Sequence, residues 1–94
     1  MSNVVTCNPI FVDTPGSILT SPATIKTILW VSDSASSIIT DNNMKILDKS
    51  GGNVICAKRA KAAGDGLEIS FGSGIHVQGI YVSELDGGIL LIYV

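Results

Sequence analysis

The segment Gly88-Ile89-Leu90-Leu91-Ile92-Tyr93-Val94 is the part of this 94-residue sequence that constrains the fold most strongly. Successive residues of a strand point to opposite sides of a sheet, so Ile89, Leu91 and Tyr93 need one apolar environment. Leu90, Ile92 and Val94 need a second one. An exposed edge strand with such an uncharged apolar run would promote aggregation. The segment is therefore predicted to be central in a sheet or covered by another subunit.

We expect both faces of this segment to be covered by other parts of the protein or by a partner. One face is expected to pack on the core of the same domain. The face formed by Leu90, Ile92 and Val94 is expected to be covered by a loop from residues 1–24 or by a neighbouring subunit. Charged residues make up only 15 % of the chain, against about 25 % in an average soluble domain. Such a weakly hydrated surface favours the subunit.

Net charge and hydropathy restrict the class of partner. A formal charge of −2 gives no long-range attraction to nucleic acid or to an anionic membrane. The sequence has no apolar run of about 20 residues, and residues 1–6 show no secretory signal. We predict no direct nucleic-acid partner and no membrane partner.

Turn residues recur at short intervals between segments rich in Ile, Val, Leu and Thr, which is typical of all-β proteins. The sequence predicts an antiparallel β-sandwich or small barrel of about seven strands. The chain is predicted to form a single domain over residues 1–94, with residues 1–24 as an extended N-terminal arm or edge segment. The predicted strands cover residues 4–7, 10–13, 25–31, 38–40, 44–47, 53–58, 67–71, 75–85 and 88–94.

Glycine positions predict how some of these strands connect. Residues 44–47 and 53–58 flank Gly51-Gly52, which allows the bend of a hairpin. The turn at 84–88 predicts a second hairpin. Between them, the apolar positions change parity at Gly79, which predicts a β-bulge there. Residues 57–63 have a helix-favouring composition, but Gly64 stops any helix within two turns.

No catalytic, cofactor or metal-binding motif is recognisable, so we predict a protein without enzymatic activity and without a cofactor or metal. His76 is the only histidine and is expected at the surface or in an interface. The aspartates are scattered among turns, where they are expected to stabilise the turn backbone. Cys7 and Cys56 are expected to be reduced thiols, with a disulfide between them as the alternative.

A few side chains qualify as interface candidates. The cluster Lys58-Arg59-Ala60-Lys61 is expected in a solvated loop or hairpin arm, with an acidic protein partner and nucleic acid as less favoured alternatives. Trp30 and Tyr81 are expected to pack in the core or to anchor an interface. The complete set of candidate interface residues is Leu90, Ile92, Val94, Trp30, Tyr81, Lys58, Arg59 and Lys61.

The last two-thirds of the chain resemble small all-β virion proteins of tailed bacteriophages that decorate or cement a capsid. The pattern consists of residues 25–31, Met44-Lys45-Ile46-Leu47-Asp48 with Gly51-Gly52, residues 73–82, and Gly88 to Tyr93. The resemblance implies a structural subunit, often trimeric, that lies across the major capsid protein in a virion assembled in the host cytoplasm. It transfers no functional residue to this chain.

Three alternatives to a capsid decoration subunit remain open at this point. The first is a tail or head–tail structural subunit. The second is a carbohydrate-binding β-sandwich module, which requires an exposed aromatic groove around Trp30 or Tyr81. The third is a small enzyme or enzyme inhibitor, which requires His76 and a carboxylate to converge in the fold.

Overall fold

The computed structural model describes residues 3–6, 8–34 and 36–94, and this part of the chain contains strands and no helix. The strands are β1 (Ile10–Val12), β2 (Gly16–Leu19), β3 (Ala23–Val31), β4 (Asn43–Leu47), β5 (Val54–Arg59), β6 (Leu67–Val77), β7 (Ile80–Leu85) and β8 (Ile89–Tyr93). The all-β prediction is confirmed, with eight strands instead of about seven. β2 is the strand that the sequence did not predict, and residues 38–40 form no strand.

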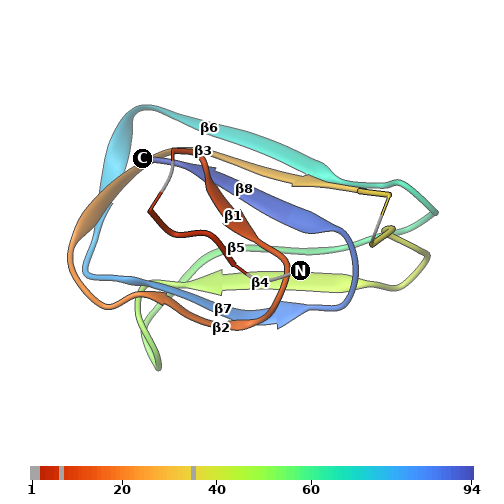
Figure 1. The fold of residues 1–94 in the computed structure, drawn as a ribbon, viewed down its shortest axis with the longest axis horizontal. Coiled ribbons are helices and arrows are strands. Elements are labelled where there is room, and N and C mark those ends of the chain that lie inside the picture. The colour runs from red at the N-terminus through yellow and green to blue at the C-terminus, as the bar shows by residue number, and fades with distance from the viewer. Residues whose placement is uncertain (1–2, 7, 35) are drawn as a thin grey trace.

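The strands form two antiparallel sheets that pack face to face (Figure 1). Sheet A has the order β1-β8-β3-β6, and sheet B has the order β2-β7-β4-β5. Only β4 and β5 are consecutive in the chain and adjacent in one sheet, because every other connection passes from one sheet to the other. This order is that of a jelly roll. The predicted hairpin of residues 44–58 is therefore present.

The C-terminal strand β8 lies inside sheet A, paired with β1 on one side and with β3 on the other. The prediction of a central strand is confirmed. Leu90 and Ile92 are 0 % exposed and belong to the core between the sheets. The predicted orientation of the strand was wrong, because the face of Leu90 and Ile92 is the core face and the opposite face points outward.

The predicted continuous strand over residues 75–85 is two strands in different sheets. β6 ends at Val77 in sheet A, and β7 starts at Ile80 in sheet B. Both residues face the core, since their exposures are 3 % and 0 %. The inward side reverses when the chain passes from one sheet to the other, so a change in parity at Gly79 arises without a bulge. The predicted hairpin at 84–88 is likewise a crossing from sheet B to sheet A.

A bulge lies instead between β3 and β6. Ile25 pairs with Ile75 and Thr27 pairs with Ser70, so Lys26 lies opposite the four residues 71–74. In β3 the bulge changes parity, and Ile25 and Ile28 both face the core. Within residues 71–74, Gly72 and Gly74 have φ angles of 66° and 111°, which glycine adopts without a steric cost. The bulge interrupts the free edge of sheet A and protects it from pairing with another strand.

Trp30 on β3 connects the core to the crossing between β7 and β8. Its side chain is 0 % exposed, and its indole Nε1 donates a hydrogen bond of 2.9 Å to the carbonyl oxygen of Gly87. This hydrogen bond satisfies the only hydrogen-bond donor of the buried indole. The following Gly88 has a φ of 74°, and a side chain there would collide with Ile38. The tryptophan and this glycine together fix how β8 enters sheet A.

Residues near the N-terminus cover the other edge of sheet A. Val4 forms an antiparallel bridge with Phe11 of β1. The side-chain amide of Asn8 donates to the carbonyl oxygen of Val94 at 2.8 Å and accepts from its backbone N–H at 3.1 Å. Within residues 1–24, β1 and β2 are the edge strands of sheets A and B. The prediction about Cys7 lies outside the described residues.

Candidate interaction surface

The outward side of sheet A carries a row of apolar side chains, which we call outer face A. It consists of Phe11, Leu29, Val31, Leu91 and Tyr93, all of which are half-buried. None of them belongs to the core cluster or to the residues packed against it. Phe11 pairs with Leu91, and Leu91 pairs with Leu29, so residues from three adjacent strands form one continuous apolar strip.

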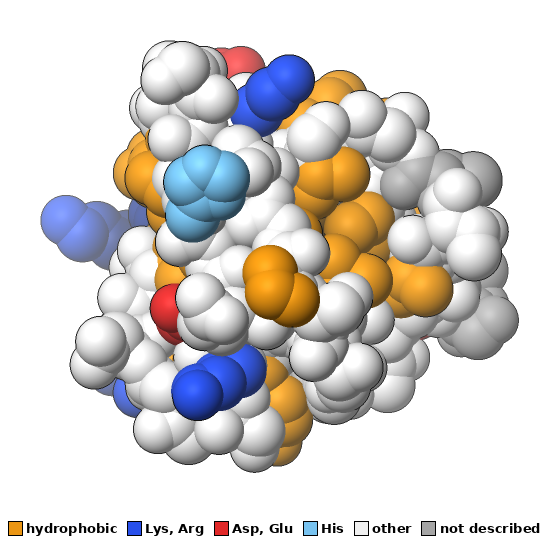
Figure 2. Space-filling model, turned by 90° about the vertical axis from the view of Figure 1, so that its left-hand side faces the viewer, with side chains coloured by type: hydrophobic (Ala, Val, Ile, Leu, Met, Phe, Trp, Pro, Cys, Tyr) orange, Lys and Arg blue, Asp and Glu red, His pale blue; other side chains and the backbone are white. Residues whose placement is uncertain are grey.

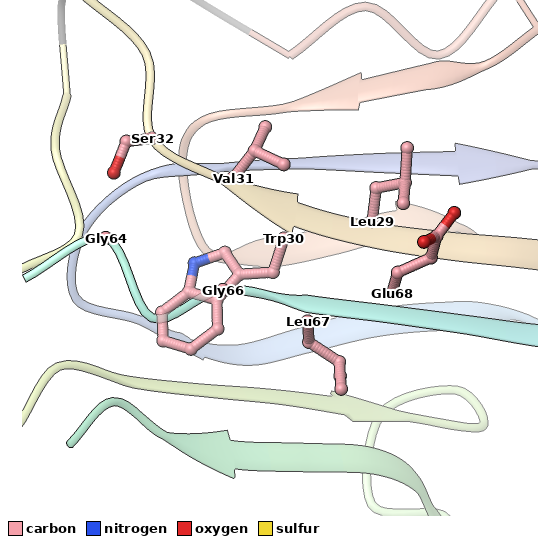
Figure 3. Close-up of a pocket in the computed structure, with 8 residues that line it drawn as sticks. All are labelled: Leu29, Trp30, Val31, Ser32, Gly64, Gly66, Leu67 and Glu68. Carbon is pink, nitrogen blue, oxygen red and sulfur yellow. The ribbon is translucent and has the colours of Figure 1, made fainter. Parts of the chain in front are cut away.

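The orientation of β3 is visible in Figure 3. Leu29, Val31 and Glu68 point to the outward side of sheet A, whereas Trp30 and Leu67 point toward sheet B. Glu68 of β6 pairs with Leu29 and therefore ends the apolar strip at its β6 side. A hollow of about 360 Å³ lies at this end, lined by Leu29, Trp30, Val31, Ser32, Gly64, Gly66, Leu67 and Glu68. Outer face A is thus an apolar strip with a carboxylate and a depression at one end.

The charged side chains of sheet A are few and lie apart from one another. Its four strands contain Lys26 and Glu68 as their only Lys, Arg, Asp or Glu residues. Both side chains are exposed. Lys26 lies at the bulge of β3, on the same side as Thr24, whose hydroxyl is 3.0 Å from Nδ1 of His76. Figure 2 shows the end of the sandwich near the C-terminus, where hydrophobic side chains gather in one area and the histidine lies beside it.

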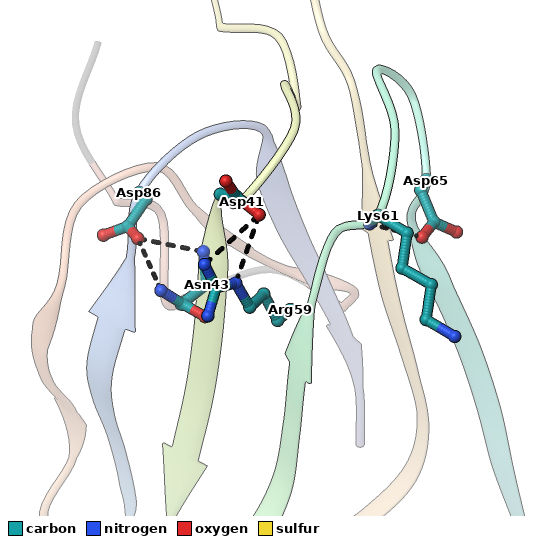
Figure 4. Close-up of polar contacts among 6 residues, drawn as sticks. All are labelled: Asp41, Asn43, Arg59, Lys61, Asp65 and Asp86. Atoms are coloured by element: carbon teal, nitrogen blue, oxygen red, sulfur yellow. Dashed lines mark hydrogen bonds and ion pairs between the residues drawn. The ribbon is translucent and has the colours of Figure 1, made fainter.

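The outward side of sheet B has a different character. Lys45 is paired in register with Glu84 and with Ala57. Beside them, the guanidinium of Arg59 is 3.2 Å from the carboxylate of Asp41, and Asp86 accepts hydrogen bonds from Asn43 (Figure 4). A shallow depression of about 320 Å³ lies among these polar groups. Charged and amide groups of this kind remain hydrated, so sheet B offers a polar surface and sheet A an apolar one.

Lys58 connects the two sheets at the side where β5 and β6 lie. It pairs with Met44, a core residue, so its stem starts on the inward side of sheet B. Its ammonium group reaches Asp65 at 3.1 Å and the carbonyl oxygen of Gly66 at 2.8 Å. Such a side chain buries its methylenes and keeps its charge at the rim. Lys58 therefore closes the core at the open side of the sandwich.

The hydrogen bonds of Asp65 predict how stability depends on pH. The backbone N–H of Lys61 and the ammonium of Lys58 hold the pKa of the Asp65 carboxyl below its ordinary value of 3.8. A lowered pKa in the folded state stabilises the protein above the ordinary value, and this contribution disappears as the pH falls through the lowered pKa. We expect Asp65→Asn to lower the urea midpoint at pH 7 and to lower it less at pH 3.

The control for this experiment is Asp41→Asn. This variant also removes one negative charge, but from an exposed ion pair in which both side chains are 67 % exposed. Exposed pairs contribute little to stability, so its urea midpoint should stay close to that of the wild type at both pH values. An Asp65→Asn defect that is as large at pH 3 as at pH 7 would show that the carboxylate charge is not responsible.

The structure places the apolar and aromatic interface candidates in three environments. Leu90, Ile92 and Trp30 are fully buried in the core, so their assignment to an interface is corrected. The pattern of apolar residues on both faces of β3 and β8 gave no indication of which face points inward. Val94 is half-buried and packs against the core cluster. Tyr81 is half-buried and, paired with Leu47, lies on the outward side of sheet B.

The basic cluster is held by its own neighbours. Lys58 and Arg59 form ion pairs with Asp65 and Asp41, and the backbone N–H of Lys61 donates to Asp65. Residues 54–59 are the strand β5, so the predicted helix-favouring composition of 57–63 produces no helix. Lys58 and Arg59 lie in the hairpin arm β5 and Lys61 lies in the loop that follows it, as the sequence predicted.

The other titratable side chains considered in the sequence are His76, the aspartates and Cys56. His76 is exposed, and its hydrogen-bond partner is Thr24. Asp65 accepts a hydrogen bond from the backbone N–H of Lys61 within its own turn, as expected. Asp48 and Asp86 instead accept from the backbone N–H groups of distant residues, Gln78 and Asn43. Cys56 is a free buried thiol whose pKa is raised by burial. Among the described residues, no three His, Cys, Asp or Glu side chains are grouped so that they could hold a metal ion.

Fold and surface together define the chain as a jelly-roll sandwich with one apolar and one polar outward side. Comparison with protein-family models, curated proteins and solved structures finds no match. In the described residues, no helix is long and apolar enough to cross a membrane. The sequence nominated none of the residues of outer face A as interface candidates; these residues are Phe11, Leu29, Val31, Leu91 and Tyr93.

Proposed function

We propose that this chain is a non-enzymatic structural virion protein, a capsid decoration or cement subunit that stabilises the capsid lattice through contacts between subunits. The observation that carries this proposal is outer face A, a half-buried apolar strip across three strands that does not belong to the core. Contiguous exposed apolar surface marks sites of protein association. A rigid sandwich with such a face is suited to repeated contacts with neighbouring subunits.

Two further features support a virion protein. The low share of charged residues, 15 %, suits a surface that is largely covered in an assembly. Jelly rolls occur in viral capsid domains and also in lectins, so the architecture fits the proposal without determining it. The partners we propose are further copies of the chain, as a homo-oligomer that includes a trimer, and the major capsid protein. The protein needs no cofactor for this role, and it resides in the virion after assembly in the host cytoplasm.

A carbohydrate-binding module is less well supported by the arrangement of the aromatic residues. Stacking against a sugar requires an exposed aromatic ring, and Trp30 is 0 % exposed. Tyr81 is half-buried beside Leu47 and Ser17 on sheet B. A subunit of a phage tail or of the head–tail junction would use outer face A in the same way as a capsid subunit, so the location of the chain in the particle decides between them.

The proposal is tested by the protein composition of purified particles. We expect peptides of this chain in the virions encoded by the same genome, in a fixed ratio to the major capsid protein. Particles assembled without the chain should lose their genome at a lower temperature and should regain wild-type stability when the purified chain is added. Absence of the chain from purified particles would overturn the proposal, and a copy number of a few per particle would place it at the tail or the head–tail junction.

A further inference from the structure

We propose that residues 3–6, which we call the strap, close a strand-pairing site on the edge of β1, and that displacing the strap allows β1 to pair with β1 of a second copy. This inference rests on the proposed function, because it adds a regulated contact between copies to a protein that assembles. Its basis is a comparison of the four edge strands, which are β1 and β6 in sheet A and β2 and β5 in sheet B.

Three of the four edge strands are irregular. Ile18 is an extra residue in β2, and Ile55 is an extra residue in β5. β6 carries the bulge of residues 71–74. Such bulges disturb the register of an edge and protect it from pairing with another chain. β1 differs, because Ile10–Val12 pair with β8 in continuous register and carry no charge. It is therefore the edge strand that is regular enough to accept a further strand.

The strap satisfies the polar backbone groups on this edge. The N–H of Phe11 donates to the carbonyl oxygen of Val4 at 2.9 Å, and the carbonyl oxygen of Phe11 accepts from the N–H of Val4 at 2.8 Å. The N–H of Asp13 donates to Oδ1 of Asn3 at 2.8 Å. Alternate residues direct their backbone groups to the same side of a strand, so the third residue at this edge is Pro9, which has no N–H. The strap therefore pairs each N–H that residues 9–13 direct to the edge.

Hydrogen bonds hold the strap, and it buries little apolar surface. Val4 and Val5 are 41 % and 38 % exposed. Few buried apolar contacts and solvent-exposed backbone hydrogen bonds are features of segments that open at a low free-energy cost. The side chains of Ile10 and Val12, by contrast, are 1 % and 0 % exposed in the core. The strap can therefore be displaced while β1 stays in sheet A.

The backbone groups of the β1 edge are complementary to the same edge of a second copy. A two-fold axis perpendicular to sheet A makes the two β1 strands antiparallel and places Phe11 of one copy opposite Phe11 of the other. These residues then exchange two hydrogen bonds, as Phe11 and Val4 do within one chain. The N–H of Asp13 in each copy faces the carbonyl oxygen of Pro9 in the other.

The second β1 is the partner that the edges of this chain favour, because β2, β5 and β6 are all bulged. Pairing the two β1 strands joins the two copies of sheet A into one continuous sheet. Directly paired residues of antiparallel strands point to the same side. Outer face A of both copies therefore lies on one side of the joined sheet, with the two Phe11 side chains at its centre.

Two substitutions in the full chain release the strap. Val4→Pro removes the N–H that donates to Phe11, and Asn3→Ala removes the side-chain acceptor of the Asp13 N–H. We expect the double variant to self-associate about tenfold or more tightly than the wild type in sedimentation equilibrium. Val5→Pro is the matched control and should associate like the wild type, because Val5 makes no backbone hydrogen bond within the described part of the chain. Circular dichroism verifies that each variant is folded.

Hydrogen exchange identifies the edge that pairs. In the double variant, the amides of Phe11 and Asp13 should exchange freely at low protein concentration and become protected as the concentration rises. The amides of Ile10 and Val12 point to β8 and should be protected at every concentration. Tighter association without a concentration-dependent protection of Phe11 and Asp13 would overturn the pairing of β1 with β1.

The outcomes separate this inference from the proposed function. A folded double variant that associates no more tightly than the wild type at about 100 µM would overturn the role of the strap. So would a Val5→Pro variant that associates as tightly as Val4→Pro. Detection of the chain in particles together with either result would leave the virion function standing. Pairing that depends on the strap, in a chain that is missing from particles, would overturn the function instead.

Discussion

Trp30→Ala is expected to lower the free energy of unfolding by about 3–5 kcal/mol, which is the usual cost of removing a large aromatic side chain from a core. The indole is 0 % exposed and also donates to the carbonyl oxygen of Gly87 at 2.9 Å. The substitution therefore leaves a cavity and an unpaired buried acceptor. Because a small domain has a free energy of unfolding of about 5–15 kcal/mol in total, the substitution should remove a large part of it. Urea denaturation followed by far-ultraviolet circular dichroism measures the change.

Trp30→Phe separates the two contributions. The phenyl ring keeps much of the packing but cannot donate to Gly87, so we expect a loss of about 1–3 kcal/mol from the unpaired carbonyl and the smaller ring. A Trp30→Ala variant that loses less than about 1 kcal/mol would show that the tryptophan is not a core residue. It would also restore the hypothesis of an exposed aromatic binding site near β3.

Leu90→Asp and Leu91→Asp are expected to have opposite consequences although the two residues are neighbours. Leu90 is 0 % exposed between the sheets, so a carboxylate there would be buried without a partner. We expect this variant to be unfolded under conditions in which the wild type is folded, with a loss of several kcal/mol. Leu91 lies on outer face A and is half-buried. Its replacement should change the free energy of unfolding by about 1 kcal/mol or less.

The contrast between these two variants is a direct test of which face of β8 is the core face. Circular dichroism spectra and urea midpoints of both variants give the result. If Leu91→Asp unfolds the protein and Leu90→Asp does not, the orientation of β8 in sheet A is wrong. Removing residues 89–94 altogether is a poorer experiment, because β8 pairs with both β1 and β3 and its loss would divide sheet A.

Those parts of the fold that depend on local sequence could be predicted. The hairpin of β4 and β5 has both strands and its glycine turn within residues 43–59, and the structure contains it. The central position of β8 also followed from its composition, since a strand that is apolar on both faces cannot remain at a free edge. These predictions need no knowledge of which distant strands become neighbours.

Other parts depend on pairings between distant residues and could not be predicted. A change in the parity of apolar positions identifies a bulge or a passage between sheets, and Gly79 shows that the sequence does not distinguish them. The two residues 78 and 79 join strands of different sheets. Conversely, the bulge at Lys26 leaves Ile25 and Ile28 both inward, although a regular strand would place them on opposite faces. Residues 71–74 of β6, which lie opposite this bulge, are distant from Lys26 in the sequence.

The candidate surface was predicted in kind and misplaced in detail. The composition of β8 predicted one apolar face that points away from the core, and the structure has such a face. Leu90 and Ile92 were assigned to it, whereas Leu91 and Tyr93 belong to it. Phe11 and Leu29 could not be nominated, because their proximity to Leu91 arises from the order β1-β8-β3. The one signal in the sequence was that residues 25–31 are also apolar on both faces.

We propose that outer face A is the assembly surface of this protein, and the mass of the Leu91→Asp variant in solution is the test of this proposal. We expect sedimentation equilibrium to give a mass above that of the monomer for the wild type and the monomer mass for the variant, with the same circular dichroism spectrum. Leu47→Asp, a half-buried leucine on the outward side of sheet B, is the matched control and should retain the wild-type mass. Equal masses for the wild type and a folded Leu91→Asp variant would contradict the claim.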